Sequence, residues 1–375
     1  MTQCKENAQT PATAQSYPEL LRRTFLTEGT MLALPLCFPG ATVPIDPNDS
    51  HVVSLDATPS GEIYGLAVGE RSHLFVAMTR GITGFCFDMG VLPAADRGTA
   101  VACSAEGVFV FAGASIHAHK LQALPFDCIQ EWGFDRTPFV GPVFTSNAGP
   151  FHAVVPTPGR RLLVAATKEE VLVLEAEKLV LRPTRSLKLR TRPDARLTVT
   201  SDGAVFGLDD KNGLWRLNPD SGALETDLWI PTLRRDTSGP QGAAFLTPIA
   251  GTGDLLVGTG QELWRIDPAN RRGSLAGRVS IGPVTSMAGT FDGRVYGSEG
   301  REIQHLFVYD PQSGETRDIG IAVSVLFHRR YGYQFAEAAT GTQGEIILGE
   351  DDRGGHLWMY LPAVRPARQS RRTSG

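Results

Sequence analysis

The chain has few cysteines, no long apolar run and no large excess of charge, and each absence removes a class of protein. Its five cysteines are odd in number and include no Cys-x-x-Cys pair, which argues against a disulfide framework and a zinc ribbon. No run of about 20 apolar residues occurs, so we expect no membrane-spanning helix. The net charge of −4 gives no electrostatic reason to expect a nucleic-acid partner. No unambiguous catalytic motif, metal signature or nucleotide-binding loop is present, and we expect no cofactor and no metal.

What the sequence has in quantity is turn residues, with 41 glycines and 25 prolines. Seven turn dipeptides each stand between two short β-rich runs, and such pairs supply the positive φ angles of tight hairpins. Consecutive dipeptides are separated by 40 to 52 residues, which is the size of one four-stranded propeller blade. The seven dipeptides are Ser60-Gly61, Glu106-Gly107, Pro158-Gly159, Asp202-Gly203, Gly253-Asp254, Asp292-Gly293 and Gln343-Gly344.

The sequence around these turns repeats as well. One strand motif occurs three times, as Gly61-Glu-Ile-Tyr-Gly65, Gly203-Ala-Val-Phe-Gly207 and Gly293-Arg-Val-Tyr-Gly297. A later strand recurs as His73-Leu74-Phe75 and His356-Leu357-Trp358. We therefore predict an all-β, seven-bladed β-propeller. The expected blades are approximately 51–93, 98–134, 141–189, 194–231, 239–282, 283–325 and 331–364.

The last expected blade has only three strands, which would leave an open sheet edge. The apolar segment 31–38 can supply the fourth strand, so we predict that the N-terminal segment closes the ring and that 19–364 is one domain. Residues 1–18 are expected to be disordered and 365–375 to form a basic tail. An alternative interpretation takes Arg22-Arg23 as a twin-arginine export signal. The localisation stays open: cytoplasmic if the segment closes the ring, exported if it is a signal.

Function is expected in the loops at one mouth of the central channel, because loops on a rigid scaffold carry binding sites. Three blades that neighbour one another around the ring place acid, arginine and histidine in order in such a loop. These residues either make structural contacts or form a polar pocket for an anionic or sugar ligand. They are Glu70, Arg71 and His73; Glu299, Arg301 and His305; and Glu350, Arg353 and His356.

The loop 327–333 holds the densest group of chemically reactive side chains. It contains Arg329, Arg330, Tyr331 and Tyr333, and topology leads it to the same mouth. Its alternative interpretation is a cationic surface loop with tyrosines packed between blades. His152 also stands where it can line the mouth.

Two further patterns suggest chemistry without specifying it. His117 and His119 alternate along one strand and so face the same way, but no third metal ligand is identifiable near them. Carboxylate pairs such as Asp351-Asp352 leave a glycoside hydrolase as a second alternative.

Through the Gly-x-Ile/Val-Tyr-Gly and His-Leu-Phe/Trp repeats, residues 51–364 resemble the seven-bladed propellers of certain polysaccharide lyases and related sugar-active proteins. The resemblance implies a poly- or oligosaccharide ligand and β-elimination from a uronic acid. Arg330 or Arg329 would then neutralise the carboxylate, and Tyr331 or Tyr333 would act as the acid. The base would be His73, His305 or His356. The rival hypothesis is a non-enzymatic binding or scaffold propeller, and in either case we expect a monomer.

Overall fold

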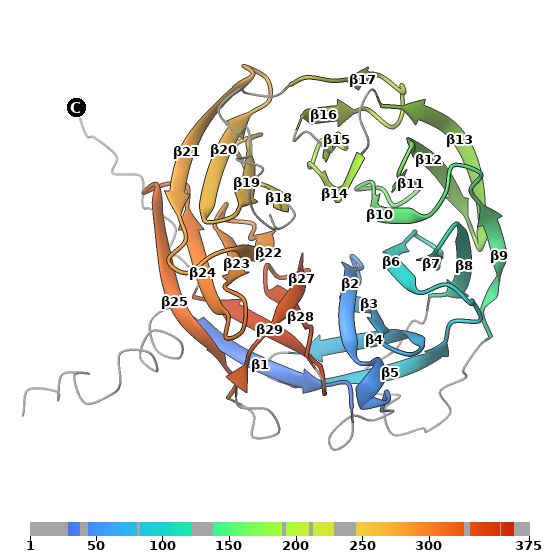
Figure 1. Ribbon diagram of the computed structural model, residues 1–375, viewed down its shortest axis with the longest axis horizontal. Helices are drawn as coiled ribbons and strands as arrows, with labels where there is room; N and C mark the ends of the chain where they lie inside the picture. Colours follow the sequence, from blue (N-terminus) through green and yellow to red (C-terminus); the bar gives the residue numbers. More distant parts are fainter. Residues whose placement is uncertain are drawn as a thin grey trace, which may run out of the picture.

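The computed structural model is a ring of seven antiparallel sheets around a central channel, as Figure 1 shows. The structure describes residues 29–37, 44–80, 83–121, 138–189, 193–209, 213–228, 245–325, 331–352 and 354–363. Apart from one short 3-10 helix, Pro47–Asp49, the regular elements of these residues are strands. The predicted all-β propeller with seven blades is confirmed.

Each blade is a sheet whose strands A to D run outward from the channel, in chain order in blades one to six. Blade one consists of β2 (His51–Ala57), β3 (Glu62–Val68), β4 (Ser72–Arg80) and β5 (Thr83–Val91). Blade two consists of β6 (Gly98–Cys103), β7 (Gly107–Ala112), β8 (Ser115–Lys120) and β9 (Val140–Thr145). Blade three consists of β10 (Phe151–Pro156), β11 (Leu162–Thr167), β12 (Glu170–Glu177) and β13 (Val180–Lys188).

The remaining blades follow the same plan. Blade four consists of β14 (Pro193–Val199), β15 (Val205–Asp209), β16 (Leu214–Leu217) and β17 (Leu224–Glu225). Blade five consists of β18 (Phe245–Pro248), β19 (Leu255–Thr259), β20 (Glu262–Asp267) and β21 (Arg272–Arg278). Blade six consists of β22 (Val284–Gly289), β23 (Val295–Glu299), β24 (His305–Asp310), β25 (Glu315–Val323) and the additional short β26 (Tyr331–Gly332).

Blade seven is built from both ends of the chain. Its strands A to C are β27 (Phe335–Thr340), β28 (Ile346–Glu350) and β29 (His356–Pro362), and its strand D is β1 (Gly29–Pro35). β1 runs antiparallel to β29, from Gly29 opposite Pro362 to Pro35 opposite His356. The predicted closure by an N-terminal strand is confirmed. The strand lies slightly earlier in the chain than the predicted 31–38, and Phe38 is outside the described residues.

The closing strand is buried because it lies between two neighbouring blades. Leu32 and Leu34 belong to a hydrophobic cluster shared with blade one, whereas Met31 and Ala33 belong to one shared with blade six. This alternation follows from the two-residue period of side chains along a strand. All four residues are at most 3% exposed, which explains why the segment reads as an uninterrupted apolar run.

The repeated glycine at the end of the Gly-x-Ile/Val-Tyr/Phe-Gly motif makes room for an aromatic ring. Gly207 lies opposite Trp215 in the next strand, and the same pairing joins Gly65 to Phe75. A side-chain Cβ at either glycine would overlap the facing ring. The last glycine of the first sequence repeat and the aromatic residue of the second therefore pack against each other as one unit.

Most predicted turns between strands A and B have the expected left-handed glycine, but Gly107 and Gly159 do not have a positive φ. The turn glycines Gly61, Gly203 and Gly293 have φ of 103°, 84° and 87°, the region that glycine adopts at little cost. At the predicted turn Pro158-Gly159 the left-handed residue is not Gly159 but Arg160, with φ of 53°. A dipeptide pattern cannot distinguish the two positions, because either residue completes a turn of similar length.

Candidate functional site

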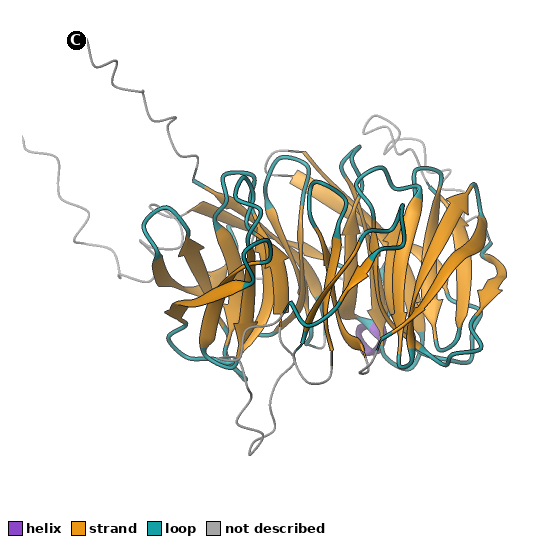
Figure 2. Ribbon diagram, turned by 90° about the horizontal axis from the view of Figure 1, so that it is seen from above, coloured by secondary structure: helices purple, strands orange, loops and turns teal. Residues whose placement is uncertain are grey.

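The propeller has two faces, each of which carries loops and turns (Figure 2). The B–C and D–A connections form the loop face, which holds the predicted site. The A–B and C–D turns form the opposite turn face. The predicted histidines His73, His305 and His356 all lie near the start of a strand C on the loop face.

His73 is held between two carboxylates at the edge of blade one. Its Nδ1 lies 3.1 Å from Asp88 Oδ1, and its Nε2 lies 3.3 Å from Asp49 Oδ2. Asp49 also accepts hydrogen bonds from the backbone N–H and the Nε of Arg71, at 2.8 and 2.9 Å. Burial alone would raise the pKa of Asp49, but the hydrogen bonds from Arg71 and His73 and the Arg71 charge lower it below its ordinary value.

His305 and His356 each contact a carboxylate in their own blade. His305 Nδ1 lies 2.9 Å from Asp318 Oδ2, and His356 Nδ1 lies 2.8 Å from Glu350 Oε2. Both His356 and Glu350 are buried. The structure thus places the three candidate bases in three separate groups, His73 with two carboxylates and His305 and His356 with one each.

The acidic partners in blades one and six come from a repeat that the sequence analysis missed. Asp88 accepts a hydrogen bond from Gly90 N–H, and Asp318 accepts one from Gly320 N–H. Each Asp-x-Gly stands at a bulge in strand D, beside the aromatic residue that follows the histidine by two positions. The order His-Leu-Phe followed by Asp-x-Gly, with 15 residues from histidine to aspartate in blade one and 13 in blade six, is the sequence signal that would have revealed the pairs.

The two candidate tyrosines lie at the outer part of the loop face. Tyr331 pairs with Val323 on the last long strand of blade six, and the Tyr333 carbonyl accepts a hydrogen bond from Gln304 N–H at 2.8 Å. Both tyrosines are 38% exposed. Arg301 lies in the neighbouring B–C loop, where its carbonyl is 3.5 Å from Gln334 Nε2. Arg329, Arg330 and Arg353 lie outside the described residues.

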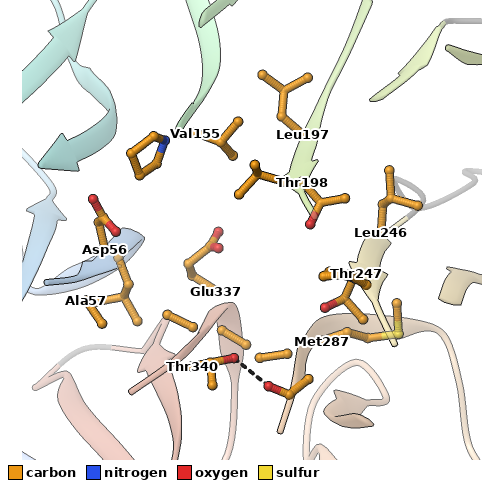
Figure 3. Close-up of a pocket in the computed structure, with 18 of the residues that line it drawn as sticks. Asp56, Ala57, Val155, Leu197, Thr198, Leu246, Thr247, Met287, Glu337 and Thr340 are labelled. Carbon is orange, nitrogen blue, oxygen red and sulfur yellow. Dashed lines mark hydrogen bonds between the residues drawn. The ribbon is translucent and has the colours of Figure 1, made fainter. Parts of the chain in front are cut away.

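The central channel forms a cavity of about 890 Å³. It is lined by strand A of all seven blades and extends to the A–B turns. Val155, Leu197, Leu246 and Met287 supply apolar wall, and threonine hydroxyls alternate with them, as Figure 3 shows. Glu337 extends from β27 toward the middle of this space. Of the described candidate residues, His152 lines the channel and the others do not.

An ion pair in the channel wall ties three blades together. Arg160 of blade three donates from Nη1 to Asp56 Oδ2 of blade one at 2.8 Å and from Nη2 to Asp56 Oδ1 at 3.0 Å. Asp56 Oδ2 also accepts from the N–H of Cys103 in blade two at 2.6 Å. Burial lowers the pKa of Arg160, but the charge of Asp56 and its hydrogen bonds raise it above its ordinary value, so the guanidinium stays charged.

The described residues provide no third ligand that could join His117 and His119 in a metal site. Among the residues with described positions, no group of three or more His, Cys, Asp and Glu side chains is arranged to hold a metal ion. His119 Nδ1 lies 2.9 Å from the Lys120 carbonyl. Burial lowers the pKa of His117. In the same part of the chain, no helix is long and apolar enough to cross a bilayer.

Comparison with known proteins identifies the fold class. No protein-family model and no curated protein matches the chain. Solved structures do match, among them one titled "Crystal Structure of Mitotic Checkpoint Complex", with a TM-score of 0.58 and 13% identity over 96% of this chain and 97% of that one. The WD40 β-propeller domain of Doa1 gives 0.55 and 10% identity, over 86% and 95% of the two chains. The extracellular domain of a putative hybrid two component system from B. thetaiotaomicron gives a TM-score of 0.56 and 12% identity. The match covers 88% of this chain but only 42% of that longer chain.

Proposed function

We propose that this protein is a non-enzymatic interaction propeller that binds a partner protein on its loop face. The observation that carries the proposal is a group of exposed apolar side chains in the sector of blades five to seven. Ile281, Ile303, Tyr331 and Tyr333 are 40%, 57%, 38% and 38% exposed. We call these four residues the apolar sector. Exposed apolar residues that gather on one face are typical of protein-binding surfaces.

The four residues come from three connections that meet at blade six. Ile281 precedes β22, Ile303 precedes β24, and the tyrosines precede β27. A Cβ placed on Gly300 would lie 3.6 Å from the Cγ2 of Ile281, and the Gln304 N–H next to Ile303 bonds the Tyr333 carbonyl. These contacts place the three connections side by side, so the exposed apolar side chains lie on one part of the loop face.

The chemistry of the loop face also favours binding over catalysis. A general base must reach a substrate proton, yet His73 is 4% and His356 8% exposed, and each is engaged by a carboxylate. One matching solved structure is titled as the WD40 propeller domain of Doa1, and another as the Mitotic Checkpoint Complex. Those titles describe those proteins, and they support a scaffold role here by analogy of fold.

The test compares partner recovery by surface variants. Ile303→Asp and Tyr333→Asp should each abolish capture of the specific partner in quantitative cross-linking. Val180→Asp is the matched control, since Val180 is 49% exposed on the outer strand of blade three. If the three variants and the unmodified protein all recover the partner equally well, the apolar sector does not bind that partner.

The polysaccharide-lyase hypothesis is the competing proposal, and one assay separates the two. Incubation with uronic-acid polysaccharides, followed by absorbance of the unsaturated product, should give no signal if the protein is a scaffold. Turnover that falls by about 10²–10⁴ in Tyr331→Phe or His356→Ala would establish the lyase instead.

A further inference from the structure

The central channel contains two buried hydroxyl groups that make no bond within the fold. Thr198 of β14 and Thr247 of β18 line the channel in neighbouring blades. They are 9% and 6% exposed, and neither hydroxyl forms a hydrogen bond among the described residues. Figure 3 shows both side chains around the open space of the channel. Their hydrogen-bonding capacity is therefore available to a molecule that enters the channel.

Other hydroxyl side chains of the channel are used by the fold. The Thr99 hydroxyl of blade two lies 3.2 Å from the carbonyls of both Phe111 and Phe151 and donates to them. The Thr340 hydroxyl of blade seven donates to the Gly289 carbonyl at 2.7 Å. These bonds hold the wall together. The two threonines of blades four and five differ from them, and this difference marks one side of the channel as a place for a ligand.

The same side of the channel is otherwise apolar. Leu197 and Leu246 precede the two threonines in their strands, and Met287 of β22 lines the channel in the next blade (Figure 3). A thioether sulfur makes favourable contacts with aromatic rings. A threonine hydroxyl donates to a carbonyl or accepts from an N–H, so two of them can bind an edge that carries both groups. This side of the channel suits a flat ring with an amide-like edge.

The charged groups that line the channel are already engaged within the chain. Asp56 is paired with Arg160, and Asp254 Oδ2 lies 2.5 Å from the Nε of Arg265. Glu337 also has an interaction within the chain. A ligand therefore needs no charge, and an uncharged one loses less hydration when it enters. The volume of about 890 Å³ lies in the range of small-molecule sites.

We propose that the central channel binds an uncharged planar ring with an amide-like edge, which the hydroxyls of Thr198 and Thr247 hold while Met287 packs against the ring. Aromatic amides and free nucleobases share this chemistry. The site is separate from the apolar sector, so it does not depend on binding of a partner protein at the loop face.

The experiment is a titration of the intact chain, followed by saturation-transfer difference NMR, with benzamide and uracil as probes. Cyclohexanecarboxamide keeps the amide without the flat ring, whereas benzoate and benzylamine keep the ring and carry a charge. We expect saturable binding of benzamide, uracil or both below about 10 mM, and at least about fivefold weaker binding of the three analogues. Tighter binding of benzamide would identify an aromatic amide as the source, and tighter binding of uracil a nucleobase. The absence of saturable binding of both probes, or equal or tighter binding of any analogue, would overturn the proposal.

Variants locate the site within the channel. Thr198→Val and Thr247→Val each remove one hydroxyl and keep the branched shape, so affinity should fall by about fivefold in each. The melting temperature should stay the same, because these hydroxyls make no bond in the chain. Thr99→Val is the matched control: it loses the hydrogen bonds to two carbonyls, so it should melt earlier but bind normally. Unchanged affinity in the double variant of Thr198 and Thr247, or an equal loss of affinity in Thr99→Val, would place the binding elsewhere and refute the proposal.

Discussion

Arg160 and Asp56 are 104 positions apart in the chain and joined by two hydrogen bonds in the channel wall. Arg160 makes these bonds from a left-handed backbone conformation, with φ of 53°, that glycine occupies in other blades. A non-glycine residue there costs about 1 kcal/mol or more. The ion pair, 12% and 11% exposed at its two side chains, offsets this cost by linking blades one, two and three.

We expect Arg160→Ala to lower the free energy of unfolding by about 3 kcal/mol, because it leaves the Asp56 carboxylate buried without its cation. Arg160→Gly removes the same pair but relieves the backbone strain, so it should be less destabilising by about 0.5–1 kcal/mol. Urea denaturation of the three proteins measures both differences. If the alanine and glycine variants were equally stable, the left-handed backbone conformation at residue 160 would carry no free-energy cost.

Gly207→Ala should destabilise the protein by about 1–3 kcal/mol, because the added methyl group overlaps the Trp215 ring. The matched control is Gly159→Ala, since nothing lies within 4 Å of a Cβ at Gly159 and its φ is not left-handed. That substitution should be neutral or slightly stabilising. Thermal melting compares the two, and a larger loss at Gly159 than at Gly207 would contradict the packing argument.

Leu32→Ala in the closing strand should cost about 2–5 kcal/mol, since Leu32 is fully buried. Deleting residues 1–40, which removes β1 and its pairing with β29, should lower stability far more. Leu275→Ala in β21 is the control, because Leu275 is 46% exposed and should change stability by less than about 0.5 kcal/mol. A truncated protein that melts like the full chain would show that the ring does not need its closing strand.

The lowered pKa of Asp49, which accepts hydrogen bonds from Arg71 and His73, should make the free energy of unfolding depend on pH. Because its pKa is lowered in the folded state, Asp49 contributes stability above the ordinary carboxyl pKa of about 4, and that contribution is lost as the pH falls through the folded value. Asp49→Asn should therefore be less stable than the unmodified protein at about pH 7, and the gap should narrow below about pH 4. Denaturant titrations at several pH values test this, with Asp220→Asn at an exposed turn as the control. A gap that is constant with pH would exclude Asp49 as the titrating group.

The fold was predictable because a propeller repeats its turns and its packing units, and repetition makes weak local signals readable. The apolar character of β1 and the three-stranded last blade were enough to predict closure. The ion pairs were not predictable in the same way. Arg160 pairs with Asp56 two blades away because the curvature of the ring brings them together. His73 contacts Asp49, which lies in the segment before β2. Glu337 is the one charged residue of β27, and no repeat in the sequence marks it as a channel residue.

The shared blade seven sets an order of events in folding. β1 is synthesised long before β29, so it must remain without its partner while six blades form, and the ring cannot close until the end of β29 has emerged. Bringing these distant strands together carries the entropy cost of a very long loop, and closure should be the slow, late step of assembly. A circularly permuted chain that joins β29 to β1 through a short linker and opens between two other blades would convert that step into a local hairpin, and should fold faster to the same ring.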